Sequence, residues 1–172
     1  MKKALLAALI ATVAMGAAQA QSFDASKGYV GIAGVSAKNE TVDGWRFGEK
    51  VFAGYDFTQN WGAEAGYSRF DNASRGTINT NAYQSYIAAK YTMPLNDQFS
   101  AYAKLGASRA VRKASDIGVS YREADTSGYG ALGVKYKLDQ NLSLNFEYER
   151  NGKQKEVGPK ADSLALGLAY GF

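Results

Sequence analysis

The segment LALGLAYGF, residues 164–172, carries the pattern that decides the fold. Every second position holds a large side chain, and only Ala and Gly stand between them; the large residues are Leu164, Leu166, Leu168, Tyr170 and Phe172. Successive side chains of a β-strand point to opposite faces of the sheet. A period of two therefore predicts a strand whose bulky groups all lie on one face.

The same period of two recurs along the chain, which at 172 residues is long enough for one domain. It predicts seven more strands, near residues 28–37, 45–57, 61–68, 83–93, 99–105, 131–138 and 142–149. The first of these is β-like, but its pattern does not tell which of its faces is which.

The connections between the expected strands alternate in length. Three are short (58–60, 95–98 and 139–141), and four are longer and polar (about 38–44, 71–82, 110–127 and 150–162). This alternation is typical of bacterial outer-membrane barrels. We therefore expect an all-β fold: an eight-stranded antiparallel up-and-down transmembrane β-barrel with short periplasmic turns and longer extracellular loops.

The second face of these strands is polar and decides which way the barrel faces. It carries the charged residues Glu64, Lys90, Lys104, Lys135 and Glu147, which we expect to form a charge cluster in the lumen. A soluble barrel with this face outward is the alternative. Aromatic residues at the strand ends favour the membrane, because such girdles mark the two interfaces of a bilayer.

The N-terminal segment has the features of a secretory signal peptide. Met1-Lys2-Lys3 is basic, residues 4–15 are apolar, and Ala18-Gln19-Ala20 is a small-x-small exit. We expect cleavage after Ala20, so that residues 1–20 are removed and residues 21–172 form the barrel domain. A retained membrane anchor is the alternative reading, although the apolar stretch is short for one.

Several segments together resemble the OmpA-type small outer-membrane barrels, a superfamily that includes the OmpX/Ail group and the opacity-type proteins. They are GYDF (54–57) with WGAEAGY (61–67), YAKLG (102–106), GVKY (133–136), FEY (146–148) and LGLAYGF (166–172). The resemblance implies location in the outer membrane of a Gram-negative cell. It also implies an assembly signal at Tyr170 and Phe172 for the outer-membrane assembly machinery, and a lumen network of acids and bases. Lys135 departs from this resemblance, because a member of the family carries an acid at the matching place.

Composition narrows the chemistry that the chain can perform. There is no Cys and no His, which excludes thiolate metal ligands and the histidine-activated serine chemistry of lipid A enzymes. A Ser–Lys arrangement is compatible with the composition, but nothing in the sequence marks one. The net charge is +4, and the sequence contains no dense run of basic residues of the kind that binds nucleic acid. We expect no enzyme, no cofactor, no metal and no nucleic-acid partner.

Basic residues near the expected long loops are candidate contacts to lipopolysaccharide, whose phosphates pair with Arg and Lys. They are Arg69, Arg109, Arg112, Lys113, Arg150 and Lys153. The alternative is a solvated surface, because acids are interspersed. The leading hypothesis is a monomeric structural protein of the outer membrane whose loops contact lipopolysaccharide or a partner. The alternatives are a small-conductance channel with a charged lumen gate, and an adhesin or serum-resistance protein with an unnamed host partner.

Overall fold

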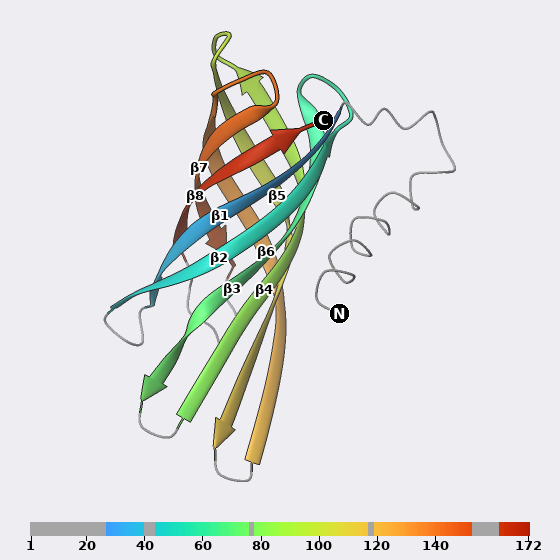
Figure 1. Ribbon diagram of the computed structural model, residues 1–172. Coiled ribbons are helices and arrows are strands. Elements are labelled where there is room, and N and C mark those ends of the chain that lie inside the picture. The colour runs from blue at the N-terminus through green and yellow to red at the C-terminus, as the bar shows by residue number, and fades with distance from the viewer. Residues whose placement is uncertain (1–26, 40–43, 76–77, 117–118, 153–161) are drawn as a thin grey trace.

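The computed structural model describes residues 27–39, 44–75, 78–116, 119–152 and 162–172 (Figure 1). The predicted signal peptide, with Ala18 and Ala20, lies outside the described residues, so its cleavage stays a prediction. No helix in the described part of the chain is long and apolar enough to cross a membrane.

The described residues form eight antiparallel strands that close into a barrel, which confirms the predicted fold. Each strand pairs with the next along the chain, and the last pairs with the first. The strands are β1 (Gly28–Asn39), β2 (Gly44–Asp56), β3 (Trp61–Arg75), β4 (Ile78–Pro94), β5 (Phe99–Asp116), β6 (Val119–Lys137), β7 (Leu142–Asn151) and β8 (Asp162–Gly171).

The barrel closes along the β1–β8 ladder. The pairing runs from Tyr29 opposite Gly171 to Ala37 opposite Ser163. Beyond its end, the Phe172 backbone N–H donates to the Gly28 carbonyl at 3.0 Å. A closed ladder satisfies the backbone of every strand, as a β-structure in hydrocarbon requires.

Strands β3 to β6 are longer than predicted. The expected loops at 71–82 and 110–127 are largely strand, because β3 and β4 stay paired to Arg75 and Ile78, and β5 and β6 to Asp116 and Val119. Figure 1 shows these two hairpins extending past the rest of the barrel at the end opposite the short turns. The error has a physical cause: a strand pair that leaves the bilayer needs no alternating apolar residues, so its sequence reads as a loop.

The faces of the wall are apolar outside and polar inside. Large apolar side chains are exposed on the outer surface, including Leu105 (74%), Ile32 (65%) and Leu132 (64%). The residues that alternate with these along each strand point into the barrel and are mostly buried. In β1, Ile32 is exposed whereas Val35 is 1% exposed, which settles the facing that the sequence left open. The soluble alternative with a polar outer face is therefore wrong.

The outer surface also carries pairs of aromatic rings at the short-turn end of the barrel. Trp61 and Tyr91 lie 4.9 Å apart by ring centroid, and Phe99 and Tyr136 lie 4.7 Å apart. These pairs join neighbouring strands in direct register. Exposed aromatic rings at one height are the expected girdle at a membrane interface.

Glycines on the inner face make room for aromatic rings. Four pairs stand directly opposite each other across neighbouring strands: Gly31 and Phe52, Gly54 and Tyr29, Gly66 and Tyr86, and Gly133 and Tyr102. In each pair, a Cβ added at the glycine would overlap the partner's ring. The rings therefore lie against bare backbone, which lets four large side chains fit inside a narrow barrel.

Candidate functional site

The barrel interior holds a chain of five buried charged residues, here called the central cluster: Lys50, Glu64, Lys104, Glu147 and Glu149. The Lys104 Nζ lies 2.6 Å from a Glu64 oxygen and also contacts Glu147. The Lys50 Nζ lies 2.6 Å from Glu147 and also contacts Glu149. Acids and lysines alternate in the order of contact, which is Glu64, Lys104, Glu147, Lys50 and Glu149. Each lysine therefore joins two acids.

Tyrosine hydroxyls supply further donors to the acids of the central cluster. Glu64 accepts from Tyr29 at 2.8 Å and from Tyr86. Glu149 accepts from Tyr129 at 3.1 Å. The rings of Tyr86 and Tyr129 stack with centroids 4.4 Å apart. The cluster holds three acids but only two lysines. The tyrosine hydroxyls supply hydrogen bonds to acids that the two lysines cannot fully pair.

A layer of neutral polar side chains lies beside the central cluster, toward the long-hairpin end. The Asn151 Oδ1 accepts from Gln84 at 2.8 Å and from Ser108 at 2.9 Å. The Ser108 hydroxyl also lies 3.1 Å from that of Ser127. All these bonds join different strands, so this polar layer braces the wall from inside.

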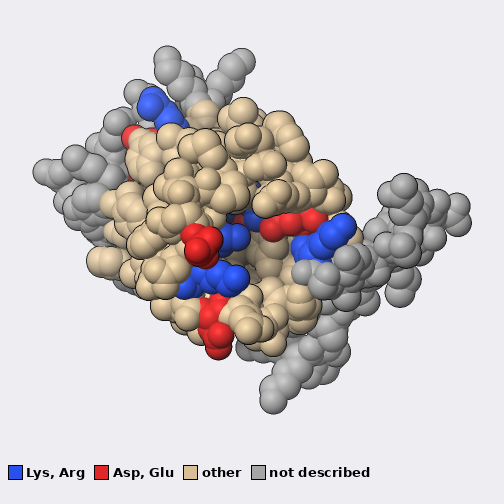
Figure 2. Space-filling view, turned by 90° about the horizontal axis from the view of Figure 1, so that it is seen from above, with Lys and Arg blue, Asp and Glu red and all other residues tan. Residues whose placement is uncertain are grey.

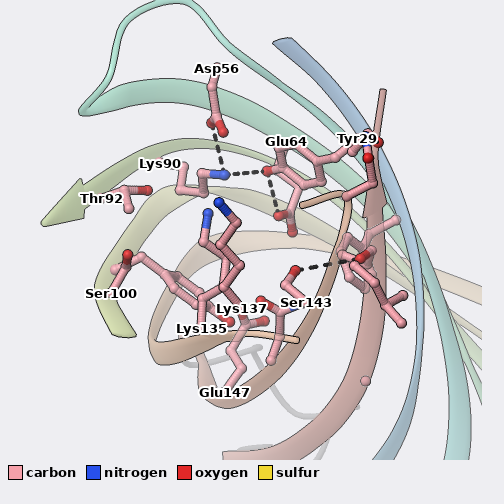
Figure 3. A pocket seen from close by; sticks show the side chains of 18 of the residues that line it. Tyr29, Asp56, Glu64, Lys90, Thr92, Ser100, Lys135, Lys137, Ser143 and Glu147 are labelled. Atoms are coloured by element: carbon pink, nitrogen blue, oxygen red, sulfur yellow. Dashed lines mark hydrogen bonds and ion pairs between the residues drawn. The ribbon is translucent and has the colours of Figure 1, made fainter. Parts of the chain in front are cut away.

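The other half of the lumen is a cavity of about 520 Å³ that extends from the short turns to the central cluster. Figure 2 looks onto this end and shows acidic and basic side chains gathered around a recess. Inside, the Lys90 Nζ bridges Asp56, at 2.8 Å, and the Tyr29 hydroxyl, at 2.8 Å (Figure 3). Lys135, Ser100 and Asn145 also line the cavity.

All five residues of the predicted lumen charge cluster lie inside the barrel. Glu64, Lys104 and Glu147 are joined in the central cluster, and Lys90 pairs with Asp56 instead. Lys135 is half-buried, lines the cavity and makes no ion pair with a described residue.

Sequence reasoning missed three charged members of the interior: Lys50, Asp56 and Glu149. The sequence could have identified them, because all three alternate with the large apolar residues of their strands and so belong to the polar face. It also missed the contribution of Tyr29, for which no signal existed while the facing of β1 was unknown.

On the outer surface, Arg69 of β3 and Arg109 of β5 lie on the two sides of β4. Arg69 is opposite Tyr83, and Arg109 is opposite Ser85, two residues further along β4. Tyr67 stacks on Tyr83 with centroids 6.3 Å apart. Arg69, Arg109, Tyr67 and Tyr83 are here called the arginine patch, and both arginines are exposed.

The other candidate lipopolysaccharide contacts are placed differently. Arg150 is exposed and lies 3.9 Å from Asp162 of the neighbouring strand. Arg112 and Lys113 belong to β5, but their side chains are outside the described part of the structure, as is all of Lys153. Tyr170 and Phe172 contact each other edge to face at the end of β8. No group of His, Cys, Asp and Glu among the described residues is arranged to hold a metal ion.

A closed eight-stranded wall with an apolar outer face and an ion-paired interior defines an outer-membrane β-barrel. The chain belongs to the family of the outer membrane protein beta-barrel domain, whose model matches residues 4–172. It is accordingly a protein of the Gram-negative outer membrane. No curated protein sequence matches the chain.

Solved structures show the same fold. Neisserial surface protein A matches with a TM-score of 0.66 and 19% identity, over 84% of this chain and 96% of that chain. Ail, the attachment invasion locus protein of Yersinia pestis, matches in its complex with the heparin analogue sucrose octasulfate, with a TM-score of 0.63 and 23% identity over 84% and 96% of the two chains. The N-terminal barrel of Pseudomonas aeruginosa OprF matches with a TM-score of 0.62 and 14% identity over 84% and 97%.

Proposed function

We propose that this protein is a non-enzymatic structural component of the outer membrane whose arginine patch binds the phosphates of lipopolysaccharide. The observation that carries the proposal is the position of Arg69 and Arg109. Both are exposed on the outer wall, toward the long-hairpin end, where we place the outer leaflet. The barrel then acts as an anchor that holds this patch at a fixed depth.

The chemistry of the patch suits a phosphorylated lipid. Strands in a sheet lie about 4.8 Å apart, so two arginines separated by one strand stand on the order of 10 Å from each other. That spacing allows each guanidinium to engage its own phosphate, and Arg binds phosphate through two parallel N–H···O bonds. The neighbouring pair of Tyr67 and Tyr83 adds apolar area for the sugar and acyl groups.

The Ail structure is consistent with recognition of polyanions by a barrel of this fold, because its ligand is a sulfated sugar. The absence of His and Cys supports the non-enzymatic part of the proposal. The channel hypothesis finds no comparable support, because the cavity lining reaches the central cluster and includes no residue of the neutral polar layer. The adhesin hypothesis finds no comparable support either, because the connections 71–82 and 110–127 are largely paired strand and the side chains of residues 71–82 and 112–123 lie outside the described part of the structure.

The test compares thermal unfolding of the refolded protein in phosphatidylcholine vesicles with and without lipopolysaccharide. The shift of the folded band on unboiled gels measures the folded fraction. We expect lipopolysaccharide to stabilise the natural protein more than the variant with Arg69→Gln and Arg109→Gln. The difference should be roughly 1–2 kcal/mol, since a basic residue at an anionic surface contributes about 1 kcal/mol.

The matched control is Arg150→Gln, because Arg150 is also exposed but lies beside Asp162. It should keep the stabilisation by lipopolysaccharide. Dephosphorylated lipopolysaccharide should stabilise the natural protein and the double variant equally. Equal stabilisation of both by the phosphorylated lipid would refute the arginine patch as its binding site.

A further inference from the structure

Three hydrogen-bond donors form a row across the inner wall of the cavity. Ser100 on β5 is opposite Lys135 on β6, and Lys135 is opposite Asn145 on β7. All three line the cavity. Because neighbouring strands lie about 4.8 Å apart, the row spans about 10 Å of wall and presents a hydroxyl, an ammonium and an amide.

The donors of this row have no acceptors in the described structure. The Asn145 Nδ2 is buried and has no hydrogen-bond partner. Lys135 makes no ion pair or hydrogen bond with any described residue. Burying an amide donor without an acceptor costs free energy, and an ammonium without a counterion costs more.

The acids on the strands that line the cavity have other partners than Lys135. Asp56 is bound by Lys90, and Glu64 is bound by Lys104 and two tyrosine hydroxyls. Glu147 lies between Lys50 and Lys104. Lys135 therefore faces the cavity without a counterion among the described residues, beside an amide that also lacks an acceptor.

We propose that Ser100, Lys135 and Asn145 form a binding site for a small oxyanion, of the size and charge of a phosphate group, which enters from the short-turn end of the barrel. Lys135 supplies the charge, and Asn145 and Ser100 supply directed donors on its two sides. Figure 3 shows Lys135 directed into the same cavity as Lys90, whose charge is also favourable to an anion. The site lies inside the barrel and is independent of the arginine patch on its outer wall.

The ligand must be small and must come from the aqueous side. The cavity of about 520 Å³ extends from the short turns to the central cluster, so it has room for a phosphate with its water. A tetrahedral oxyanion offers several acceptor oxygens, so it can accept from the ammonium of Lys135 and from a neighbouring amide or hydroxyl at once. A halide ion would use the charge of Lys135 but would gain less from the directed donors.

The experiment uses the refolded chain in maltoside micelles, which contain no phosphate. Inorganic phosphate is added at constant ionic strength, with chloride as the exchanged ion, while NMR follows the side-chain amide of Asn145. We expect a saturable shift of this amide for phosphate. Lys135→Met should weaken binding at least about tenfold, the loss expected for one charge-assisted hydrogen bond.

The matched control is Lys137→Met, which removes an exposed lysine of the same strand at the mouth of the cavity. It should leave phosphate affinity within about twofold of that of the natural protein. Equal weakening by both lysine variants would show only a diffuse positive potential and would overturn the site. A shift of Asn145 that does not saturate, or that survives Lys135→Met unchanged, would overturn it as well. Because Lys135 makes no ion pair in the described structure, its removal is not expected to unfold the barrel.

Discussion

At the scale of single residues, the interior is packed so closely that one carbon atom matters. Gly66 stands opposite Tyr86, and a Cβ at Gly66 would overlap its ring. We expect Gly66→Ala to displace the ring from Glu64 and from Tyr129, and to lower the free energy of unfolding by about 1–3 kcal/mol, as overpacking does. Urea unfolding from lipid vesicles measures the loss.

The control for this prediction is Gly34→Ala. An added Cβ at Gly34, which is exposed on β1, meets no heavy atom within 4 Å. Its unfolding midpoint should stay unchanged or rise slightly. If the two alanine variants lose the same stability, the effect arises from the strand backbone, and the ring contact is not its cause.

Lys104 is the residue on which two buried acids depend. Lys104→Met would leave Glu64 with hydroxyl donors alone, and Glu147 with Lys50 and the hydroxyl of Tyr129 at 3.4 Å. Removing one partner of a buried ion pair costs about 3–5 kcal/mol. We expect the folded fraction on unboiled gels to fall at a lower urea concentration. The double variant with Glu64→Gln should recover part of this loss, and failure to recover any would contradict the pairing.

The sequence was sufficient to place Glu64, Lys104 and Glu147 on one face, because alternation assigns every residue of a strand to a side. It could not show which lysine meets which acid, since partners such as Lys50 and Glu149 come from strands far apart in the chain. Such pairing depends on the order and register of the closed wall. Nor could it show that Lys135 lacks a partner, for the same reason.

At the scale of elements, the short turns are held by their own side chains. The Thr58 Oγ1 accepts from the backbone N–H of Trp61 at 2.9 Å, and the Asn96 Oδ1 accepts from that of Phe99 at 2.7 Å. Such bonds fix a turn from within. Thr58→Val keeps the shape of the side chain but removes the acceptor, so we expect a loss of about 1 kcal/mol in urea unfolding.

Gln59 provides the comparison, because it is exposed in the same turn and its side chain makes no hydrogen bond with a described residue. Gln59→Ala should change the unfolding midpoint by less than Thr58→Val does. A Thr58→Val protein as stable as the natural one would mean that water replaces the lost bond at no cost.

The turns were predicted well and the long hairpins were not, and the difference is physical. The turns at Leu95 and Leu138 share one bonding pattern, in which two successive N–H groups donate to the carbonyl of Phe99 or of Leu142. That likeness follows from the repeated sequence around them. The extended parts of β3 to β6 follow instead from backbone pairing, which leaves no hydrophobic period to read.

At the scale of the whole molecule, the outward apolar face predicts the depth of each ring in the bilayer. In a Trp45→Phe variant, Trp61 is the sole tryptophan, because the chain has two. Trp61 is exposed at the short-turn end beside Tyr91. We expect its fluorescence to be quenched more by lipids brominated near the headgroup than by lipids brominated at mid-chain, as for an interfacial ring.

The same measurement checks the facing of the wall. Trp61 in the natural orientation contacts lipid. Its quenching by brominated lipids should therefore not depend on whether an aqueous quencher is added to the solution that fills the lumen. Strong quenching by aqueous acrylamide without quenching by either lipid would place the ring in the lumen and would contradict the structure.

The β1–β8 ladder has a consequence for how the chain can exist at all. An open sheet that loses an outer strand is merely narrower, but a ring that loses any strand gains two rows of bare N–H and C=O groups facing hydrocarbon, where water cannot solvate them. Loss of a single strand is therefore expected to destabilise the whole barrel and not only the part that is missing. All eight strands must be present before the barrel can be stable in the membrane, because β1 finds one of its two neighbours only in β8, the last strand of the barrel.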